Sequence, residues 1–377
     1  MSNDQARQIY EQLGLRPLIN AGGNRTVLGG SRIRPAVQAA AEAANEHYVD
    51  MTALLRQTGK IIAPLLGAEA AMVTPGCFAA MALAAAACMS GSDPQKIEQL
   101  PDTAGMKDEF LIQACQRYKY DRAMTIFGGK LIEVGDPQAA TVEQLRAAIT
   151  DKTAAILYLA VGRRPGELPV ESVIAVAKER GVPVIVDAAS EVYPFDRLRR
   201  YTDLGADLVC FGGKYFGSYN STGLLAGREA LMEAAFLHSF VGFETSAYRS
   251  LGRPFKLDRQ EIVATVVALQ EWLDMDHEER IAGQERRGQI ISQAAGGIAH
   301  VAVEWVPEER AISNSVHLTI DEAALGKTVG QISQALQEGT PSIWVGRKDN
   351  TLQVTVSELT EEEAQIVAER LRAVLLN

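Results

Sequence analysis

Short β-rich runs alternate with helical stretches between residues 69 and 227, and this alternation constrains the fold more than any other feature of the sequence. Strands that alternate with helices indicate crossover connections, which build a doubly wound, mainly parallel sheet. Gly181 is expected to end one of the helices as its C-cap. The sequence predicts strands at residues 71–73, 123–127, 154–159, 182–186, 207–211 and 223–226, and helices between them that include 141–149 and 170–180.

A second pattern begins near residue 253, where a long helical tract is expected from 258 to about 294. After it, strands are expected at 300–305, 315–320, 342–345 and 352–356, interleaved with helices at 329–337 and 361–376. A chain of 377 residues, 47% of them hydrophobic, is long enough for two domains. We expect an N-terminal segment (1–50), a large α/β domain (51–255) and a small α+β C-terminal domain (256–377).

Composition excludes several classes of protein. The formal net charge of −10 argues against a protein that coats nucleic acid, because such binding needs a concentrated basic surface. The N-terminus has no apolar core for a signal peptide, and the longest apolar stretch, residues 78–89, is too short to span a bilayer and is expected to form a buried helix. The cysteines show neither metal-ligand spacing nor the density of a disulfide scaffold, which favours a reducing compartment; they are Cys77, Cys88, Cys115 and Cys210. We expect a cytoplasmic protein with no metal, nucleic-acid partner or membrane partner.

Two residues that follow apolar strands indicate the chemistry. Asp187 ends the buried run that begins at Val184, and Lys214 follows the run 208–211 after two glycines. In open α/β sheets ligands bind beyond the carboxyl ends of strands, so both side chains are expected in one crevice. A lysine that forms a Schiff base and a carboxylate that keeps a pyridine nitrogen protonated are the two groups that pyridoxal 5'-phosphate (PLP) needs. The pair therefore indicates PLP, with Lys214 and Asp187 as the catalytic residues.

The tetrapeptide Phe-Gly-Gly-Lys occurs twice, at 211–214 and at 127–130. Taken alone, a buried aspartate and a lysine in a glycine turn are more often structural than catalytic. Lys214, however, comes after an aspartate-ended strand and before the small-residue run 217–223, whereas Lys130 leads directly into a strand-like run. This context favours Lys214 as the functional lysine.

Residues 71–80 pass from a strand through a Pro-Gly turn into an alanine-rich helix. Free backbone N–H groups and the positive end of the helix dipole favour an anion at such a junction, and Gly76 allows close approach. Thr74, Gly76 and Cys77 are therefore candidate ligands of the cofactor phosphate. Further candidates, for which ordinary turn chemistry is the alternative, are Ser218, Asn220, Ser221 and Thr222.

An aromatic ring that stacks on the cofactor is expected within residues 113–122, which contain Tyr118 and Tyr120. The sequence does not show which of the two stacks, and Tyr118 is our candidate for binding the cofactor. The carboxylate of an amino-acid substrate is best bound by an arginine fork. Arg347 is the first candidate for this contact, and Arg25 and Arg32 are its rivals. The glycine-rich run 19–31 is expected to be a loop that lines the pocket.

Several segments together resemble the fold-type I PLP enzymes, in the branch related to bacterial selenocysteine synthase that includes D-glucosaminate-6-phosphate ammonia-lyase. These segments are residues 19–21, 28–31, 47–51, 67–71, 100–107, 186–189 and 212–214. The resemblance implies a fold-type I transferase fold in which Lys214 carries the cofactor, Asp187 pairs with its pyridine nitrogen and the Gly76-Cys77 turn holds its phosphate. It also implies a homodimer or higher homo-oligomer with active sites at the subunit interface, lined in part by residues 1–50.

The sequence departs from this branch at several positions. Phe211 stands where many relatives have a serine, and residues 218–220 read Ser-Tyr-Asn where relatives often have Gly-Pro-Gln or Gly-Pro-Asn. Arg117 stands where a histidine is expected in the ammonia-lyase. The chain is also acidic and lacks an extended N-terminal domain, which disfavours the transfer-RNA binding that a selenocysteine synthase requires. The departures affect the expected phosphate contacts and the substrate.

These observations predict a PLP-dependent lyase that removes water and ammonia from a small hydroxy amino acid or amino sugar acid to give a 2-oxo acid. The Lys214 amine would remove the α-proton while the cofactor ring stores the electrons. Reprotonation on the other face would instead make the protein an amino-acid racemase or epimerase, and a related aldolase or transferase belongs to the same alternative. A PLP-binding protein without turnover is the remaining hypothesis.

Overall fold

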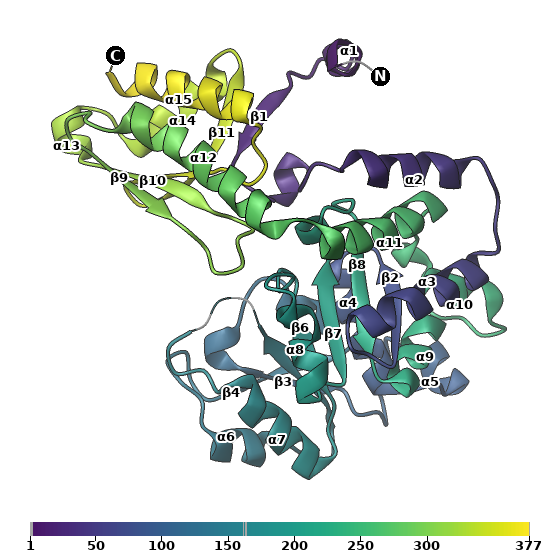
Figure 1. Cartoon of the computed structure of the whole chain (residues 1–377). Helices are drawn as coiled ribbons and strands as arrows, with labels where there is room; N and C mark the ends of the chain where they lie inside the picture. The colour runs from purple at the N-terminus through teal and green to yellow at the C-terminus, as the bar shows by residue number, and fades with distance from the viewer. Residues whose placement is uncertain (1–2, 161, 163, 377) are drawn as a thin grey trace. The chain divides into compact units, whose positions relative to one another are not determined.

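The computed structural model describes residues 3–160, 162 and 164–376, with side chains from residue 8 onward. The chain forms two compact units, a larger one from Ile33 to Leu273 and a smaller one made of the two ends of the chain, up to Arg32 and from Asp274 (Figure 1). These units differ from the expected segments 1–50, 51–255 and 256–377. The N-terminal strand pairs with a C-terminal strand, and the helix after residue 258 packs on the larger unit, so neither end of the chain forms a unit of its own.

A seven-stranded sheet with the order β2-β8-β7-β6-β5-β3-β4 forms the core of the larger unit. Its strands are β2 (Ala70–Thr74), β3 (Glu109–Gln113), β4 (Lys130–Val134), β5 (Thr153–Leu159), β6 (Val184–Asp187), β7 (Leu208–Gly212) and β8 (Gly223–Gly227). All neighbours from β7 to β4 run parallel, whereas β8 runs antiparallel to both β7 and β2. The prediction of a mainly parallel sheet is confirmed.

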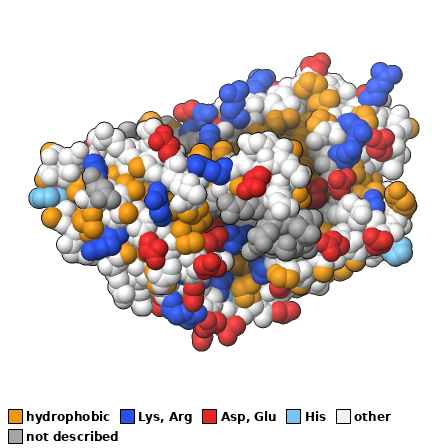
Figure 2. All heavy atoms as spheres, turned by 90° about the horizontal axis from the view of Figure 1, so that it is seen from above, with side chains coloured by type: hydrophobic (Ala, Val, Ile, Leu, Met, Phe, Trp, Pro, Cys, Tyr) orange, Lys and Arg blue, Asp and Glu red, His pale blue; other side chains and the backbone are white. Residues whose placement is uncertain are grey.

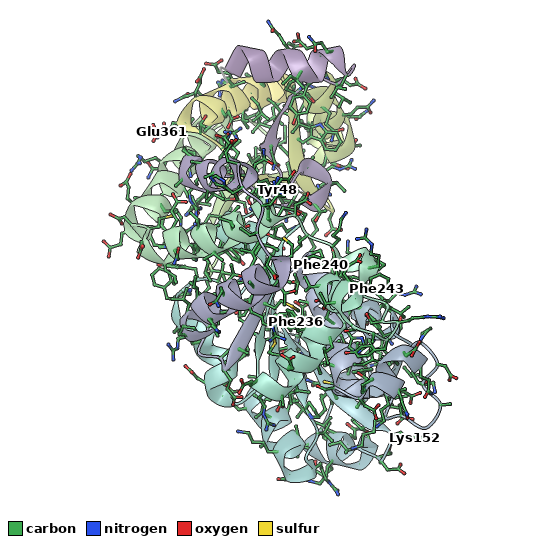
Figure 3. All side chains as sticks on the ribbon, turned by 90° about the vertical axis from the view of Figure 1, so that its right-hand side faces the viewer. Tyr48, Lys152, Phe236, Phe240, Phe243 and Glu361 are labelled. Atoms are coloured by element: carbon green, nitrogen blue, oxygen red, sulfur yellow. The ribbon has the colours of Figure 1, made fainter. Side chains whose placement is uncertain are left out.

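Several helices of the larger unit pack on this sheet. The larger unit also contains the 3-10 helices η2 (Ala114–Gln116), η3 (Asp121–Thr125), η4 (Gly213–Phe216) and η5 (Arg253–Phe255). Figure 3 shows Phe236, Phe240 and Phe243 close together on α9 and α10. The α-helices are α2 (Pro35–Asn45), α3 (Met51–Leu65), α4 (Cys77–Ser90), α5 (Pro94–Gln99), α6 (Val142–Ala148), α7 (Val170–Arg180), α8 (Asp196–Leu204), α9 (Glu229–Leu237), α10 (Phe240–Thr245) and α11 (Arg259–Asp274).

Small residues bring two helices close to the sheet. The alanine-rich helix α4 packs along β5 to β8 and is buried over most of its length, as predicted. Its small side chains allow the backbone of the helix to lie close to the strands. Gly59 of α3 does the same against β2, since a Cβ there would lie 2.1 Å from the carbonyl oxygen of Ala71.

Two expected elements differ in the structure. Residues 123–127 do not form a strand, because most of this run belongs to η3, and the neighbour of β4 is the unpredicted β3. Met124 and Phe127, three residues apart, are buried while the two residues between them are exposed, which is helical spacing and not the alternation of a strand. The helical tract expected from 258 to 294 is two helices, α11 and α12 (His277–Ala295), because Asp276 caps the second one by accepting a hydrogen bond from the Glu279 N–H at 3.0 Å.

The smaller unit contains a five-stranded sheet with the order β1-β11-β12-β10-β9. β1 runs parallel to β11 and the other pairs are antiparallel. Its core includes Ile291 of α12, Leu336 of α14 and Leu371 of α15. The elements are α1 (Asn3–Gln12), β1 (Leu18–Ala21), η1 (Thr26–Leu28), α12, β9 (Val301–Val306), β10 (Ser315–Ile320), α13 (Glu322–Leu325), α14 (Val329–Glu338), β11 (Ser342–Lys348), β12 (Thr351–Thr355) and α15 (Glu361–Leu376).

Residues 19–31 were expected to form a loop. In the structure the first of them belong to strand β1, and the later ones include the 3-10 helix η1. No helix in the described part of the chain combines the length and the apolarity needed to cross a membrane. On the face drawn in Figure 2, basic and acidic side chains are interspersed and not gathered by sign.

Candidate cofactor site

The carboxyl ends of β6 and β7 bring the two predicted catalytic residues to one edge of the sheet. β6 and β7 are parallel neighbours, and Asp187 is in register with Cys210. Lys214 follows two residues after the end of β7, on η4. The Gly213 N–H donates to the Thr222 carbonyl at 2.8 Å, and a Cβ on Gly213 would lie 2.2 Å from the Thr222 hydroxyl. Glycine at this position therefore lets the chain pass close to Thr222, just before Lys214 at the edge of the sheet.

Asp187 is buried, with 4% of its surface exposed, and receives hydrogen bonds from separate parts of the chain. Its Oδ1 accepts from the Ala189 N–H at 3.0 Å and from the Cys77 thiol at 3.4 Å, and its Oδ2 accepts from the Tyr118 hydroxyl. Burial raises the pKa of Asp187, and the bonds from Tyr118, Ala189 and Cys77 act in the opposite direction. The carboxyl group is thus fixed in orientation by its donors.

Tyr118 and Cys77 remain protonated donors in this cluster. Burial raises the pKa of both groups, and the charge of Asp187 raises both further. A neutral phenol and a neutral thiol can each donate a hydrogen bond to a carboxylate, whereas their anions would repel it. The cluster therefore favours a single charge, located on Asp187.

Lys214 is partly buried, and its Nζ lies 5.2 Å from the centre of the Tyr215 ring. Burial lowers the pKa of Lys214, and the positive charge of Lys119 lowers it further. A lysine with a lowered pKa has a larger neutral fraction near pH 7, and the neutral amine is the form that acts as a nucleophile or base.

Arg34 holds the turn that contains Lys214 (η4, hereafter the lysine turn) in place by hydrogen bonds. This arginine is not among the residues predicted from the sequence. Its Nη2 donates to the carbonyl oxygens of Phe216 at 3.2 Å and Ala268 at 3.3 Å, and its Nε lies 2.8 Å from a carboxylate oxygen of Glu271. Gly217 has φ +83°, and a Cβ there would lie 2.2 Å from Arg34 Nη1. Arg34 therefore joins the end of η4 to α11.

The predicted phosphate turn lies between β2 and α4. Thr74 ends β2, and its hydroxyl donates to the Gly76 carbonyl oxygen at 3.1 Å. Gly76 is the N-cap of α4 with φ 87°, and as a glycine it has no side chain to bond the first N–H groups of this helix. Cys77 is the first residue of α4 and also contacts Asp187, so this helix terminus lies beside the carboxylate.

The hydroxyls after Lys214 serve the fold of the loop. Thr222 Oγ1 donates to Ser218 Oγ at 2.8 Å, and Ser218 Oγ lies 2.9 Å from Thr265 Oγ1 on α11. The Ser221 hydroxyl donates to Glu261, and Asn220 is only partly exposed. A role of Ser218, Asn220, Ser221 and Thr222 in binding phosphate stays a prediction.

The candidate arginines for a substrate carboxylate all belong to the smaller unit. Arg32 forms an ion pair with Glu363 at 2.6 Å. Arg25 and Arg347 are exposed. Their contact with a substrate stays a prediction. In the part of the chain that the structure describes, no group of His, Cys, Asp and Glu side chains could hold a metal ion.

Comparison with known families gives a match over most of the chain. Residues 38–313 match the family described as "Aminotransferase class-V". The chain belongs to the class-V aminotransferase family. PLP is the cofactor of this family, and the fold-type I fold and the cofactor predicted from the sequence are confirmed.

Three individual proteins are similar in sequence to this class-V protein, and one of them also has a solved structure. It is 30% identical to 5'-C-glycyluridine monooxygenase-decarboxylase from Streptomyces sp, over 98% of this chain and 92% of that one. It is 27% identical to D-glucosaminate-6-phosphate ammonia lyase from Salmonella typhimurium (strain 14028s / SGSC 2262), over 97% of each chain. A solved structure of D-glucosaminate-6-phosphate ammonia-lyase has a TM-score of 0.84 at 28% identity and covers 98% of each chain. L-seryl-tRNA(Sec) selenium transferase from Geobacter sulfurreducens (strain ATCC 51573 / DSM 12127 / PCA) is 24% identical over 59% of this chain and 46% of that one. The resemblance drawn from the sequence is therefore confirmed.

Proposed function

We propose that this class-V protein is a PLP-dependent ammonia-lyase that acts on a small hydroxy amino acid or amino sugar acid. The observation that carries the proposal is the pairing of a partly buried lysine of lowered pKa with a buried, donor-fixed aspartate at the same sheet edge. The similarity to D-glucosaminate-6-phosphate ammonia lyase over nearly the full chain supports elimination of ammonia. Loss of a β-hydroxyl as water, with a 2-oxo acid as product, is part of the same proposal.

The residues present fit the cofactor. Asp187 Oδ2 has a lone pair beyond the one that accepts from Tyr118, and this oxygen would hold the pyridine nitrogen in its protonated state. The N–H groups at the start of α4, with Thr74, Gly76 and Cys77, would hold the phosphate. Tyr118 would lie beside the pyridine ring, because its hydroxyl already reaches the carboxylate that binds the ring.

The chemistry divides between cofactor and protein. When bound, PLP supplies an electron sink for the bond that breaks at the substrate α-carbon. Lys214 Nζ, whose neutral fraction is enlarged by its lowered pKa, accepts the α-proton. The same Nζ then donates a proton to the β-hydroxyl, which leaves as water. The released enamine takes up water and yields the 2-oxo acid and ammonia.

A second candidate function is oxidative decarboxylation of an α-amino acid. It is favoured by the 30% identity to 5'-C-glycyluridine monooxygenase-decarboxylase, which also spans nearly the full chain. The two reactions break different bonds at the α-carbon, the bond to hydrogen in the lyase and the bond to the carboxylate in the decarboxylase. Oxidative decarboxylation also consumes molecular oxygen: the α-amino acid becomes an amide, and carbon dioxide and water are released.

Product analysis of the PLP-loaded protein tests the proposal. The panel consists of both enantiomers of serine and threonine, and of D-glucosaminate with and without a 6-phosphate. Ammonia and a 2-oxo acid in equal amounts, absent with Lys214→Ala, are the expected result. Carbon dioxide release with oxygen uptake would replace the proposal by the second candidate. Inversion of the substrate without ammonia would identify the racemase predicted as an alternative from the sequence.

The oligomeric state, the cellular location and the residues that bind the substrate carboxylate are further parts of the proposal. A homodimer or higher homo-oligomer in the cytoplasm is what we propose for this protein, with Arg347, Arg25 or Arg32 as ligands of the substrate carboxylate.

A further inference from the structure

The segment after η2 places a second cation near the functional lysine. Tyr118 of this segment reaches Asp187, and Lys119 is the next residue. Lys119 is exposed, and its Nζ lies 4.7 Å from the centre of the Tyr120 ring. Its charge is close enough to Lys214 to lower the pKa of that amine. The site therefore contains two lysines whose charges repel each other.

Arg117, two residues before Lys119, is neutralised by carboxylates, whereas Lys119 is not. Arg117 forms ion pairs with Asp121 at 2.6 Å and with Glu133. Among the described residues, no carboxylate lies within ion-pair distance of Lys119. An anion placed here would be attracted by Lys119 and would relieve the repulsion between the two amines.

The other charged groups around the lysine turn are already engaged. Asp187 on β6 accepts from its three donors, and Arg34 and Glu271 pair with each other at the far end of η4. Among the described residues, Lys119 is therefore a charged group that lowers the pKa of Lys214 and has no carboxylate within ion-pair distance. The arginines predicted for the same task lie in the smaller unit, so they do not account for this charge.

The surroundings of Lys119 favour a ligand with one anionic end. Phe78, at the start of α4, and Tyr120 lie edge to face with ring centres 6.5 Å apart, and 38% and 46% of their surfaces are exposed. Tyr118 and Tyr120 are also in edge-to-face contact, at 6.0 Å. A lysine beside an aromatic surface is held by the ring and still presents its N–H donors to an anion.

We propose that Lys119 binds an anionic group of the substrate, a carboxylate or a phosphate, beside Lys214. This assignment rests on the proposed function, since it names a contact made by the substrate of that site. It adds a specificity-determining residue from the larger unit to the candidates of the smaller one. Substrates without an anionic group at this place would leave the charge of Lys119 without a counter-ion and would bind less well.

Removing the charge of Lys119 by mutation and neutralising it with a bound anion should shift the pKa of a nearby nitrogen in the same direction. A neighbouring positive charge disfavours the protonated form of a nitrogen, so removing the charge raises the pKa of that nitrogen. Binding an anion to Lys119 cancels part of its field and has the same effect. The nitrogen by which Lys214 holds the cofactor reports both, because its protonation changes the near-visible absorbance of the protein.

The test is a pH titration of this absorbance in the PLP-loaded protein. Lys119→Gln is expected to raise the midpoint by about 0.5 to 1 pH unit, and Lys119→Arg to leave it near the wild-type value. Lys107→Gln is the matched control, since Lys107 is also an exposed lysine of the larger unit and the change removes the same charge. A Lys119→Gln midpoint equal to that of Lys107→Gln overturns the proposal. Lys119→Met serves as a second neutral variant should the first fold poorly.

Inorganic phosphate and acetate then distinguish the two anionic groups at constant ionic strength. A midpoint that rises in the wild type with phosphate alone assigns a phosphate group, and one that rises with acetate assigns a carboxylate. Neither shift is expected in Lys119→Gln. The absence of a shift with both anions in the wild type overturns anion binding by Lys119. Because the readout needs no turnover, failure to release ammonia would overturn the proposed function, while a shift of the midpoint with an added anion would still show that Lys119 binds anions.

Discussion

The two Phe-Gly-Gly-Lys segments have the same four residues and lie in the same compact unit, yet their lysines occupy opposite edges of the sheet. Lys214 follows the carboxyl end of β7, whereas Lys130 is the first residue of β4. All strands from β7 to β4 run parallel, so the end of one and the start of the other lie at different edges. Ligand sites of such sheets form at the carboxyl edge, where only Lys214 lies.

The surroundings of the two lysines shift their pKa values in opposite directions. Burial lowers the pKa of Lys214, and the charge of Lys119 lowers it further. Lys130 has 64% of its side chain exposed, and the carboxylate of Asp108, 2.7 Å away, raises its pKa. Position relative to the strand, and not the local sequence, therefore decides whether the lysine of this tetrapeptide is a partly buried amine of lowered pKa or part of a surface ion pair.

The largest expected effect comes from replacing each lysine by alanine. Lys214→Ala should lose the near-visible absorbance that borohydride bleaches, and its ammonia release should fall roughly 10²- to 10⁴-fold from lost proton transfer alone. Lys130→Ala should keep both, because its amine only pairs with Asp108. Absorbance spectra and ammonia assays of the two variants check this. Loss of the bleachable band in Lys130→Ala, or its survival in Lys214→Ala, would reverse the assignment.

The aspartates beside the two lysines allow the next comparison. Asp187→Asn removes the charge that keeps a pyridine nitrogen protonated, and we expect ammonia release to fall on the order of 10²-fold, with weaker PLP binding. Asp108→Asn is the matched control, because Asp108 is also buried and also pairs with a group of this unit, yet lies at the other edge. The Asp108→Asn variant should have a lower thermal stability and should still bind PLP. Equal losses of PLP affinity in the two variants would contradict a specific role of Asp187.

Elements with a clear period and a clear end could be predicted from the sequence. The helix expected at 170–180 is α7, and Gly181 caps it in the left-handed conformation. The run at 123–127 misled because its apolar residues are buried at helical spacing, which a short run cannot distinguish from a strand. The break at Asp276 was missed because two helices in succession share one continuous apolar pattern.

Residues of the site could be predicted where they follow a strand directly. The positions of Asp187 and Lys214 at the carboxyl edge of the sheet were predicted in this way, and so was the glycine turn before α4, whereas their roles in catalysis and cofactor binding stay predictions. Arg34 could not be found, because it reaches the Phe216 carbonyl across a separation of 182 residues and nothing in its local sequence marks that contact. Contacts of this kind depend on packing between elements, and a single sequence does not show which elements meet.

The second glycine of each tetrapeptide gives a smaller effect. A Cβ on Gly213 would lie 2.2 Å from the Thr222 hydroxyl, and one on Gly129 would lie 2.3 Å from the Met124 carbonyl oxygen. Both Gly→Ala variants should lower the free energy of unfolding by about 1–3 kcal/mol through overpacking. Only Gly213→Ala should also weaken PLP binding, since it displaces Lys214. Urea unfolding and PLP titration measure the two quantities, and a similar drop in PLP affinity in Gly129→Ala would show that the loss is a general effect of destabilisation.

The smallest effect concerns the pH dependence of stability around the Lys130 segment. His238 is fully buried, its ring is edge to face with Phe127 at 5.4 Å, and burial lowers its pKa from 6.5 to about 4. Because the folded state holds the proton less tightly than the unfolded state, the stability from this group is present above pH 6.5 and is lost as the pH falls toward 4. Between pH 7 and 5.5 the loss should be about 1 kcal/mol. Urea unfolding at both pH values should show a smaller difference for His238→Gln than for the wild type, while His47→Gln, at an exposed site, should leave the difference in place. An unchanged difference in His238→Gln would mean that other groups produce the acid sensitivity of this edge of the sheet.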